Sequence, residues 1–172
     1  MRQHTCTRSA FALGAAIFFG TTAMAADLPK EGTYGGSYYG VGTVKATHIG
    51  KELILFVFDE NGYSLGHGWF DHMTWHCWGS ANFINGVGTP RGSCVGMDPA
   101  GNQISADWVH EKWTSLDAKN VHGSLKITGG TGKFAGISGG HNYVAHPNEF
   151  RTAVEGTYAS YTTDNEGSYK LP

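Results

Sequence analysis

Histidine and carboxylate side chains are the first candidates for chemistry in this chain, because together they can move protons near neutral pH. A histidine titrates in that range, and burial in an apolar pocket shifts the pKa of a carboxyl group toward it. The alternative for each of these histidines is a structural role as a hydrogen-bonded or half-exposed side chain. The predicted catalytic residues are His72, His76, Asp71, His110, Glu111 and Glu155.

Aromatic side chains are the second notable group, since the 172-residue chain carries 5 Trp, 8 Tyr and 9 Phe. Ligand pockets are lined mainly by apolar and aromatic side chains, with a few polar groups that orient the ligand. Aromatic residues also fill cores and interfaces, which is the alternative for each tryptophan. The predicted ligand-binding residues are Trp69, Trp75, Trp78, Trp108 and Arg151, and the expected ligand is a small aromatic or lipophilic molecule.

The segment from His67 to Trp78 concentrates three His and three Trp. If it is one strand, His72 and His76 share one face, while Trp69, Asp71 and Trp75 share the other. A closed barrel has one interior, so apolar side chains on both faces predict that the outer face packs against another subunit.

The pair His72 and His76 also suggests a metal site, but on a strand the two residues lie about 13 Å apart. Two ligands of one zinc ion cannot span that distance. No metal is therefore predicted, although a site built by histidines from several strands remains an alternative. The sequence Gly132-Lys133 lacks the spacing of a phosphate-binding loop, and no organic cofactor is expected.

Runs rich in β-branched and aromatic residues alternate with glycine-marked turns along the whole chain. The fold class is therefore predicted to be all-β, a single antiparallel β-barrel of about eight strands, with a sandwich as the alternative. Turns are predicted at 48–50, 59–62, 98–101 and 146–148. The predicted strands span 38–48, 52–59, 66–78, 89–97, 103–113, 121–128, 133–145 and 150–162, and a polar tail from 163 could add a last strand near 169–171.

A glycine-dense stretch, Gly129-Gly130-Thr131-Gly132-Lys133-Phe134-Ala135-Gly136-Ile137-Ser138-Gly139, is the most distinctive motif. It resembles the late-strand motif of the allene oxide cyclase and dirigent-protein barrels, small all-β proteins that guide cyclisation or coupling of lipophilic molecules. The resemblance implies a barrel and a homo-oligomer, with a trimer as in those families. It implies no catalytic residue, because the glycines and the Phe of this motif serve the architecture.

Residues 1–25 have a basic start, an apolar run and Ala23-Met24-Ala25, which predicts a secretory signal peptide. The expected β-barrel domain is then 26–172, located in the periplasm or secreted. Cys77 and Cys94 remain as an even pair in an oxidising compartment, which predicts a disulfide, with a reactive thiol as the alternative.

The net charge of the chain limits the kinds of partner that we expect. The chain has 14 acidic and 12 basic residues, and loss of the predicted leader would remove Arg2 and Arg8 and make the net charge more negative. Nucleic-acid binding is excluded by the absence of a basic stripe, and no membrane partner is expected. The leading hypothesis is a cofactor-free isomerase, cyclase or lyase that holds its substrate in the barrel. The alternatives are a non-catalytic binding protein for a lipophilic ligand and a structural or interaction module.

Overall fold

The computed structural model describes residues 28–113, 119–153 and 156–172, and within these it describes only the backbone of 148–153 and 156–159. The predicted signal peptide and Glu155 lie outside the described residues. Among the described helices, none has the length and apolar character needed to cross a membrane.

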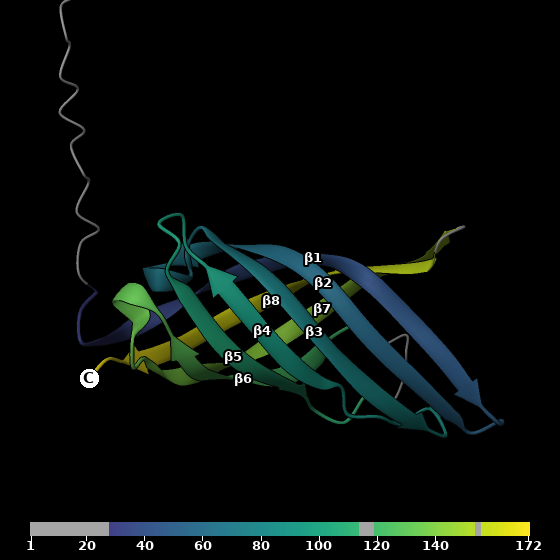
Figure 1. The fold of residues 1–172 in the computed structure, drawn as a ribbon. Coiled ribbons are helices and arrows are strands. Elements are labelled where there is room, and N and C mark those ends of the chain that lie inside the picture. The colour runs from purple at the N-terminus through teal and green to yellow at the C-terminus, as the bar shows by residue number, and fades with distance from the viewer. Residues whose placement is uncertain (1–27, 114–118, 154–155) are drawn as a thin grey trace, which may run out of the picture.

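Eight antiparallel strands close into a barrel, in which each strand pairs with the next and β8 pairs with β1 (Figure 1). The predicted all-β barrel is confirmed. Two single-turn 3₁₀ helices lie between strands, η1 (Gly68–Phe70) and η2 (Gly132–Phe134). The strands are β1 (Glu31–Ile49), β2 (Leu53–His67), β3 (Met73–Ile84), β4 (Arg91–Met97), β5 (Gln103–His110), β6 (Val121–Gly130), β7 (Ser138–Ala153) and β8 (Gly156–Lys170).

The strand predicted over 66–78 is wrong as a single element, because the chain reverses direction inside it. β2 ends at His67 and β3 begins at Met73, with η1 between them. Gly68 and His72 both have positive φ, 67° and 59°, which a continuous strand does not contain. His72 therefore lies in the turn, and the face that His72 and His76 were expected to share does not form.

From Met73 onward the alternation is as predicted for a strand. Met73, Trp75 and Cys77 are buried inside the barrel, whereas His76 and Trp78 are exposed on its outer surface. The interior and exterior faces of this part of the chain are thus settled by its burial pattern.

Other boundaries also differ from the sequence prediction; for example, the strand predicted over 133–145 begins at Ser138, and the one predicted over 150–162 is divided between β7 and β8. The turn predicted at 59–62 lies inside β2, where all four residues pair with β1 and β3. The turn predicted at 146–148 lies inside β7, at an irregularity between Pro147 and Glu149, because a bulge accommodates a proline without ending the strand. The polar tail is part of β8, which runs unbroken to Lys170.

The glycine-dense motif forms the connection between β6 and β7, as predicted, and it closes one end of the barrel. Gly132 has φ 58°, and a Cβ there would meet the Asn102 side chain at 1.8 Å. η2 thereby places Phe134 in the core beside Trp69 of η1, with 6.1 Å between ring centroids. These two 3₁₀ turns, packed with Tyr34 and neighbouring residues, form the plug of the barrel.

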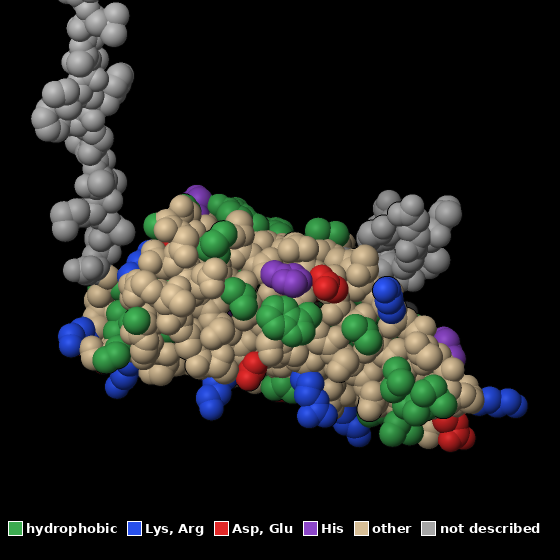
Figure 2. Space-filling model, viewed as in Figure 1, with side chains coloured by type: hydrophobic (Ala, Val, Ile, Leu, Met, Phe, Trp, Pro, Cys, Tyr) green, Lys and Arg blue, Asp and Glu red, His purple; other side chains and the backbone are tan. Residues whose placement is uncertain are grey.

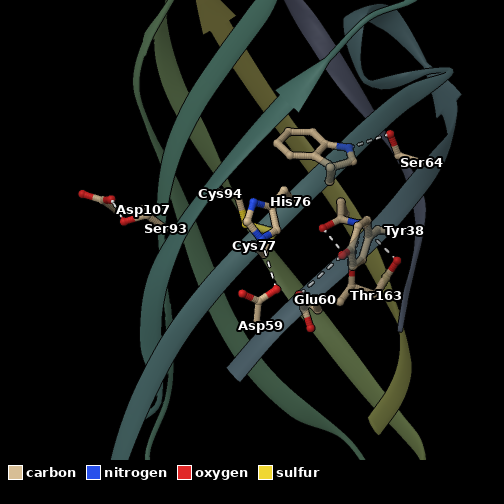
Figure 3. Close-up of a disulfide and its surroundings, with 12 residues drawn as sticks. Tyr38, Asp59, Glu60, Ser64, His76, Cys77, Ser93, Cys94, Asp107 and Thr163 are labelled. Carbon is tan, nitrogen blue, oxygen red and sulfur yellow. Dashed lines mark hydrogen bonds and ion pairs between the residues drawn. A yellow bond between two sulfur atoms is a disulfide. The ribbon is translucent and has the colours of Figure 1, made fainter. Parts of the chain in front are cut away.

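The predicted disulfide is present between Cys77 and Cys94 (Figure 3). The two residues are directly paired across β3 and β4, and their Cα atoms are 4.1 Å apart. Both side chains point into the barrel and are buried. The bond therefore joins neighbouring strands at the wall of the interior.

Candidate functional site

The barrel interior contains a cavity that extends from the plug toward the opposite end, called the mouth. Its empty volume is about 1020 Å³, which includes the space open to solvent. All eight strands contribute to the wall, because each presents alternate residues inward. Residues lining the plug side and the middle are Phe70, Trp75, Cys77, Cys94, Glu60, Tyr38, Leu125, His141, Tyr161, Thr163 and Asn165, and those nearer the mouth are Val44, Phe58, Pro90, Trp108, His110, Trp113, Val121, Tyr143 and Ala145.

Glu60 is the only carboxylic acid among the described residues that line this cavity. It follows the apolar residues Ile54, Phe56 and Phe58 on the inward face of β2, which also carries the buried Ser64. Burial raises the pKa of Glu60 to about 8, and the nearby charge of Asp59 acts in the same direction, while a hydrogen bond from Tyr38 opposes them. At neutral pH Glu60 therefore retains its proton.

Two tyrosine hydroxyl groups hold the Glu60 side chain. The Tyr38 hydroxyl, 3.4 Å away, and the Tyr161 hydroxyl both donate to Oε1 of Glu60. Burial raises the pKa of Tyr38 above its ordinary value, so this hydroxyl remains a donor across the physiological range. Because both hydroxyls donate hydrogen bonds to Oε1, the proton of the neutral acid can reside on the other oxygen, Oε2. Figure 3 shows Glu60 and Tyr38 beside the disulfide.

Two histidines with depressed basicity lie in the same cavity. Burial lowers the pKa of His110 and of His141 to about 4, so both rings are neutral at pH 7. Nδ1 of His141 is 3.0 Å from the Tyr34 hydroxyl, and Nδ1 of His110 is 3.4 Å from the Tyr143 hydroxyl. Nε2 of His141 is buried without a partner among the described residues. These rings can orient a polar group of a ligand.

Tryptophans form much of the apolar wall. Trp75 is fixed by a hydrogen bond of 3.0 Å from Nε1 to the Ser64 hydroxyl. The Nε1 atoms of Trp108 and Trp113 are buried and have no partner in the described part of the chain. The cavity thus combines flat aromatic surfaces with one protonated acid and two neutral imidazoles, which suits an aromatic or lipophilic molecule carrying a few oxygen atoms.

The structure brings three of the predicted site residues to the cavity, Trp75, Trp108 and His110. Trp69 is buried in the plug. Glu111 follows β5 and is exposed, and Trp78 is 42% exposed on the outer surface. Arg151 lies in β7 with only its backbone described, and Glu155 is outside the described residues.

The remaining predicted acid and base residues form pairs on the outside of the barrel. Nδ1 of His72 is 2.7 Å from Oδ2 of Asp71. Nε2 of His76 is 3.1 Å from Oδ1 of Asp59, and Figure 3 shows this second pair. The backbone amide of Gly66 donates to Asp71, which lowers the pKa of this carboxyl group. The pair of His76 and Asp59 is separated from the cavity by the wall of the barrel, and the pair of His72 and Asp71 lies in the turn between η1 and β3. Among the described residues, no three side chains of His, Cys, Asp or Glu gather in a way that could hold a metal ion.

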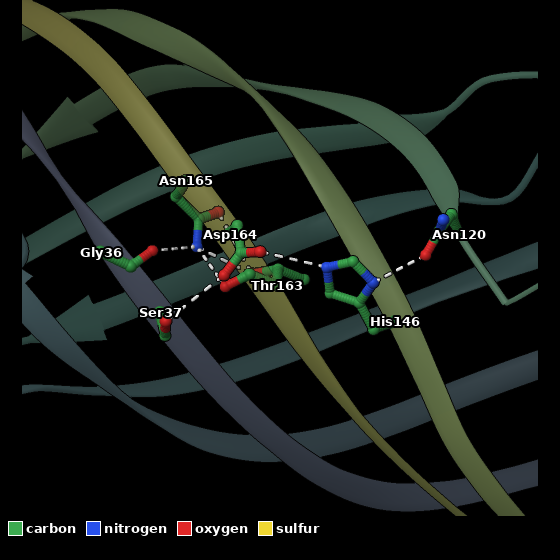
Figure 4. Close-up of polar contacts among 7 residues, drawn as sticks. All are labelled: Gly36, Ser37, Asn120, His146, Thr163, Asp164 and Asn165. Atoms are coloured by element: carbon green, nitrogen blue, oxygen red, sulfur yellow. Dashed lines mark hydrogen bonds and ion pairs between the residues drawn. The ribbon is translucent and has the colours of Figure 1, made fainter.

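A further polar network crosses the outer face of β8 and its neighbours (Figure 4). His146 contacts Oδ2 of Asp164 at 3.1 Å through Nε2 and Oδ1 of Asn120 at 2.9 Å through Nδ1. Ser37 donates to the other oxygen of Asp164 at 3.4 Å. The next residue, Asn165, points inward and donates to the carbonyl of Gly36. The contacts of His146, Asp164 and Ser37 join strands on the outside, whereas Asn165 belongs to the lining of the cavity.

The sequence prediction missed Glu60, Tyr38, Tyr161 and His141 as cavity residues. Glu60 was assigned to a turn because Asp59-Glu60-Asn61-Gly62 has typical turn composition. The signal that could have placed it is the alternation of Ile54, Phe56 and Phe58, which continues inward to position 60.

Comparison with known proteins supports the architecture. No protein-family model matches the chain, and no curated protein sequence matches it. A solved structure of a dirigent protein, described as a pterocarpan synthase, is similar with a TM-score of 0.52, 12% sequence identity, and coverage of 91% of this chain and 100% of that one. The barrel is thus dirigent-like in fold, as the glycine motif predicted.

Proposed function

We propose that this barrel binds a small aromatic or lipophilic molecule and rearranges it without a cofactor, by isomerisation, cyclisation or elimination. One observation carries the proposal: Glu60 is a carboxylic acid held in its protonated form inside an aromatic cavity. Enzymes shift the pKa of a glutamate upward in this way when it must act as a general acid near neutral pH.

In this mechanism Glu60 donates its proton to an oxygen of the bound molecule. The resulting carboxylate then removes a proton from a neighbouring atom of the same molecule, so that the acid is regenerated and no external reagent is consumed. Tyr38 and Tyr161 stabilise the transient carboxylate, because both hydroxyls already donate to Oε1. His110 and His141, neutral at pH 7, orient the polar groups of the substrate.

Proton transfer is assigned to Glu60 instead of the exposed residues His72 and His76, because those side chains are 60% and 50% exposed on the outer surface. Only a group that lines the cavity can act on a molecule held there. His110 is the one residue of the predicted acid and base set that keeps a place in this mechanism.

The similar solved structure belongs to a protein described as a synthase, which supports catalysis in a barrel of this shape. The disulfide supports export of the protein, since structural disulfides persist in oxidising compartments. The proposal therefore places the activity in the periplasm or outside the cell.

The first experiment identifies the ligand and then tests Glu60. Native mass spectrometry of protein isolated from the periplasm should reveal a retained organic molecule, and its chemical class supplies the substrates for a turnover assay. Glu60→Gln should lower kcat by about 100-fold or more, the usual contribution of a general acid. The matched control is Glu31→Gln, because Glu31 is an exposed carboxylate of β1 outside the cavity.

Equal turnover by the parent and Glu60→Gln would contradict the catalytic role of this acid. Retention of a ligand with no turnover by the parent would favour the non-catalytic binding protein instead.

A further inference from the structure

Three strands extend beyond the closed barrel at its mouth and form an arm. Pairing of β1 with β8 ends at Val44, whereas pairing of β1 with β2 continues to Ile49. Pairing of β3 with β4 stops at Ser80, whereas pairing of β3 with β2 continues to Ile84. The arm, residues 45–49, 53–57 and 80–84, therefore projects by about 16 Å, at 3.3 Å per residue.

The inner face of the arm packs against Trp113, which lines the cavity near its mouth. Phe83 is buried against Phe56 and Trp113, with ring centroids 5.1 Å and 5.9 Å apart. Ile54 and Ala81 pack in the same cluster. The arm is thus held beside the mouth by apolar packing and is not an isolated hairpin.

The outer face of the arm also carries apolar residues near its end, and the pairing register of the strands places them in one row. Ile49, Leu53 and Ile84 are directly paired across the three strands and all point outward. Ile49 is 51% exposed and Ile84 60% exposed, and Leu55 and Val57 continue the surface along β2. Figure 2 shows hydrophobic side chains gathered at this end of the molecule, where the arm runs in Figure 1.

Charged side chains lie on both sides of the row of Ile49, Leu53 and Ile84. The row of paired residues that contains Val57 begins with Lys45, passes through Ser80 to Arg91, and continues onto β5 at Val109. Lys51 lies in the turn at the tip, beside Glu52. The row of Lys45 and Arg91 lies four residues behind the tip, about 13 Å along the strands. An apolar edge followed by exposed basic side chains is complementary to acyl chains beneath anionic headgroups.

We propose that the arm docks on the surface of a bilayer that contains anionic phospholipids. The row of Ile49, Leu53 and Ile84 enters the boundary between headgroups and acyl chains, and Lys45 and Arg91 contact the phosphates. This orientation turns the mouth of the cavity toward the bilayer, so that a lipophilic molecule reaches the barrel without crossing water. The sequence predicted no membrane partner, because only the register of the three strands brings the apolar residues into one row.

The test is co-sedimentation of the mature protein with vesicles of equal parts phosphatidylglycerol and phosphatidylcholine, compared with vesicles of phosphatidylcholine alone. We expect binding to the anionic vesicles that weakens as salt is raised. Ile84→Asp should abolish it, and Lys45→Glu should weaken it about tenfold. The matched controls are Val41→Asp, at a position of β1 that is 58% exposed but lies outside the arm, and Lys126→Glu on β6.

Circular dichroism and thermal melting of each variant establish that it is folded. Absence of binding by the parent, or equal losses in Ile84→Asp and Val41→Asp, would overturn the proposal. Light scattering at several protein concentrations provides a second readout: if Ile84→Asp dissociates an oligomer while vesicle binding is absent, the occupant of the arm is a second copy of the chain. The outcome is independent of Glu60, because none of these variants alters the cavity acid.

Discussion

Glu60 supplies the barrel with a reactive group and also lowers its free energy of unfolding as pH rises above about 4.5. Its ordinary pKa of 4.5 applies when the chain is unfolded, and its folded value is about 8. Between these values the unfolded chain releases the proton while the folded protein keeps it. The contribution of Glu60 to stability is therefore complete below about pH 4.5 and is lost as pH rises toward 8.

Replacing this acid with its neutral analogue should remove that loss. We expect Glu60→Gln to gain free energy of unfolding relative to the parent as pH rises, by on the order of 1–3 kcal/mol between pH 5 and pH 8.5. Urea denaturation at several pH values measures the difference. His110 and His141 are present in both proteins, so their effect cancels in the difference. Their lowered pKa values remove stability from both proteins as pH falls from 6.5 toward 4.

A constant difference between the two proteins across this pH range would show that Glu60 is ionised in the folded barrel. The mechanism would then require another proton donor.

Residues of the cavity were predictable where strand alternation was correctly recognised. Trp108 and His110 lie on the strand predicted over 103–113, which is close to β5, whereas Trp75 lies in the part of the predicted strand 66–78 that the structure assigns to β3. Glu60 was missed because local turn composition was given more weight than the apolar period of β2. Propensity is local, whereas the pairing of Glu60 with Gly42 and Cys77 depends on strands far away in the sequence.

At the scale of the elements, the number of strands and the fold class followed from the sequence, but not every reversal did. The turn at 98–101 was predicted, and Asp98 holds it by accepting hydrogen bonds from the amides of Ala100 and Asn102. The reversal at η1 was hidden, because Trp69 and Phe70 are as apolar as strand residues. They are apolar because they form the plug, a role that only the closed barrel defines.

The disulfide between β3 and β4 should contribute measurably to stability. Cys77 and Cys94 are separated by 17 residues, and closing a loop of this size in the unfolded chain is worth about 3 kcal/mol in the chain-entropy model. We expect a reductant to lower the free energy of unfolding by about this amount in urea titrations. The double variant Cys77→Ala, Cys94→Ala is the control, since its stability should not respond to the reductant.

If the parent is equally stable with and without reductant, while mass measurement shows that the bond is reduced, the disulfide does not stabilise the barrel. Its position in the cavity wall would then be its main structural contribution.

The whole molecule is asymmetric along its axis, with a packed plug at one end and a mouth with a projecting arm at the other. In the plug, Tyr34 of β1, Ile104 of β5 and Phe134 of η2 are fully buried, and both β1 and β5 have a partner strand on each side. In the arm, residues 45–49 of β1 pair with β2 alone. Strand edges with an unpaired side are where local opening requires the least free energy.

Hydrogen exchange should report this asymmetry directly. Amides of residues 45–49 should exchange much faster than those of residues 35–44 of the same strand, because only the latter lie between two partner strands. Mass spectrometry of peptides from the two halves of β1 measures the contrast in free protein. Anionic vesicles should slow exchange in the arm without changing exchange in the plug. Equal protection of both halves in free protein would mean that the arm is already covered in solution, and the mouth would then open onto a second copy of the chain instead of a bilayer.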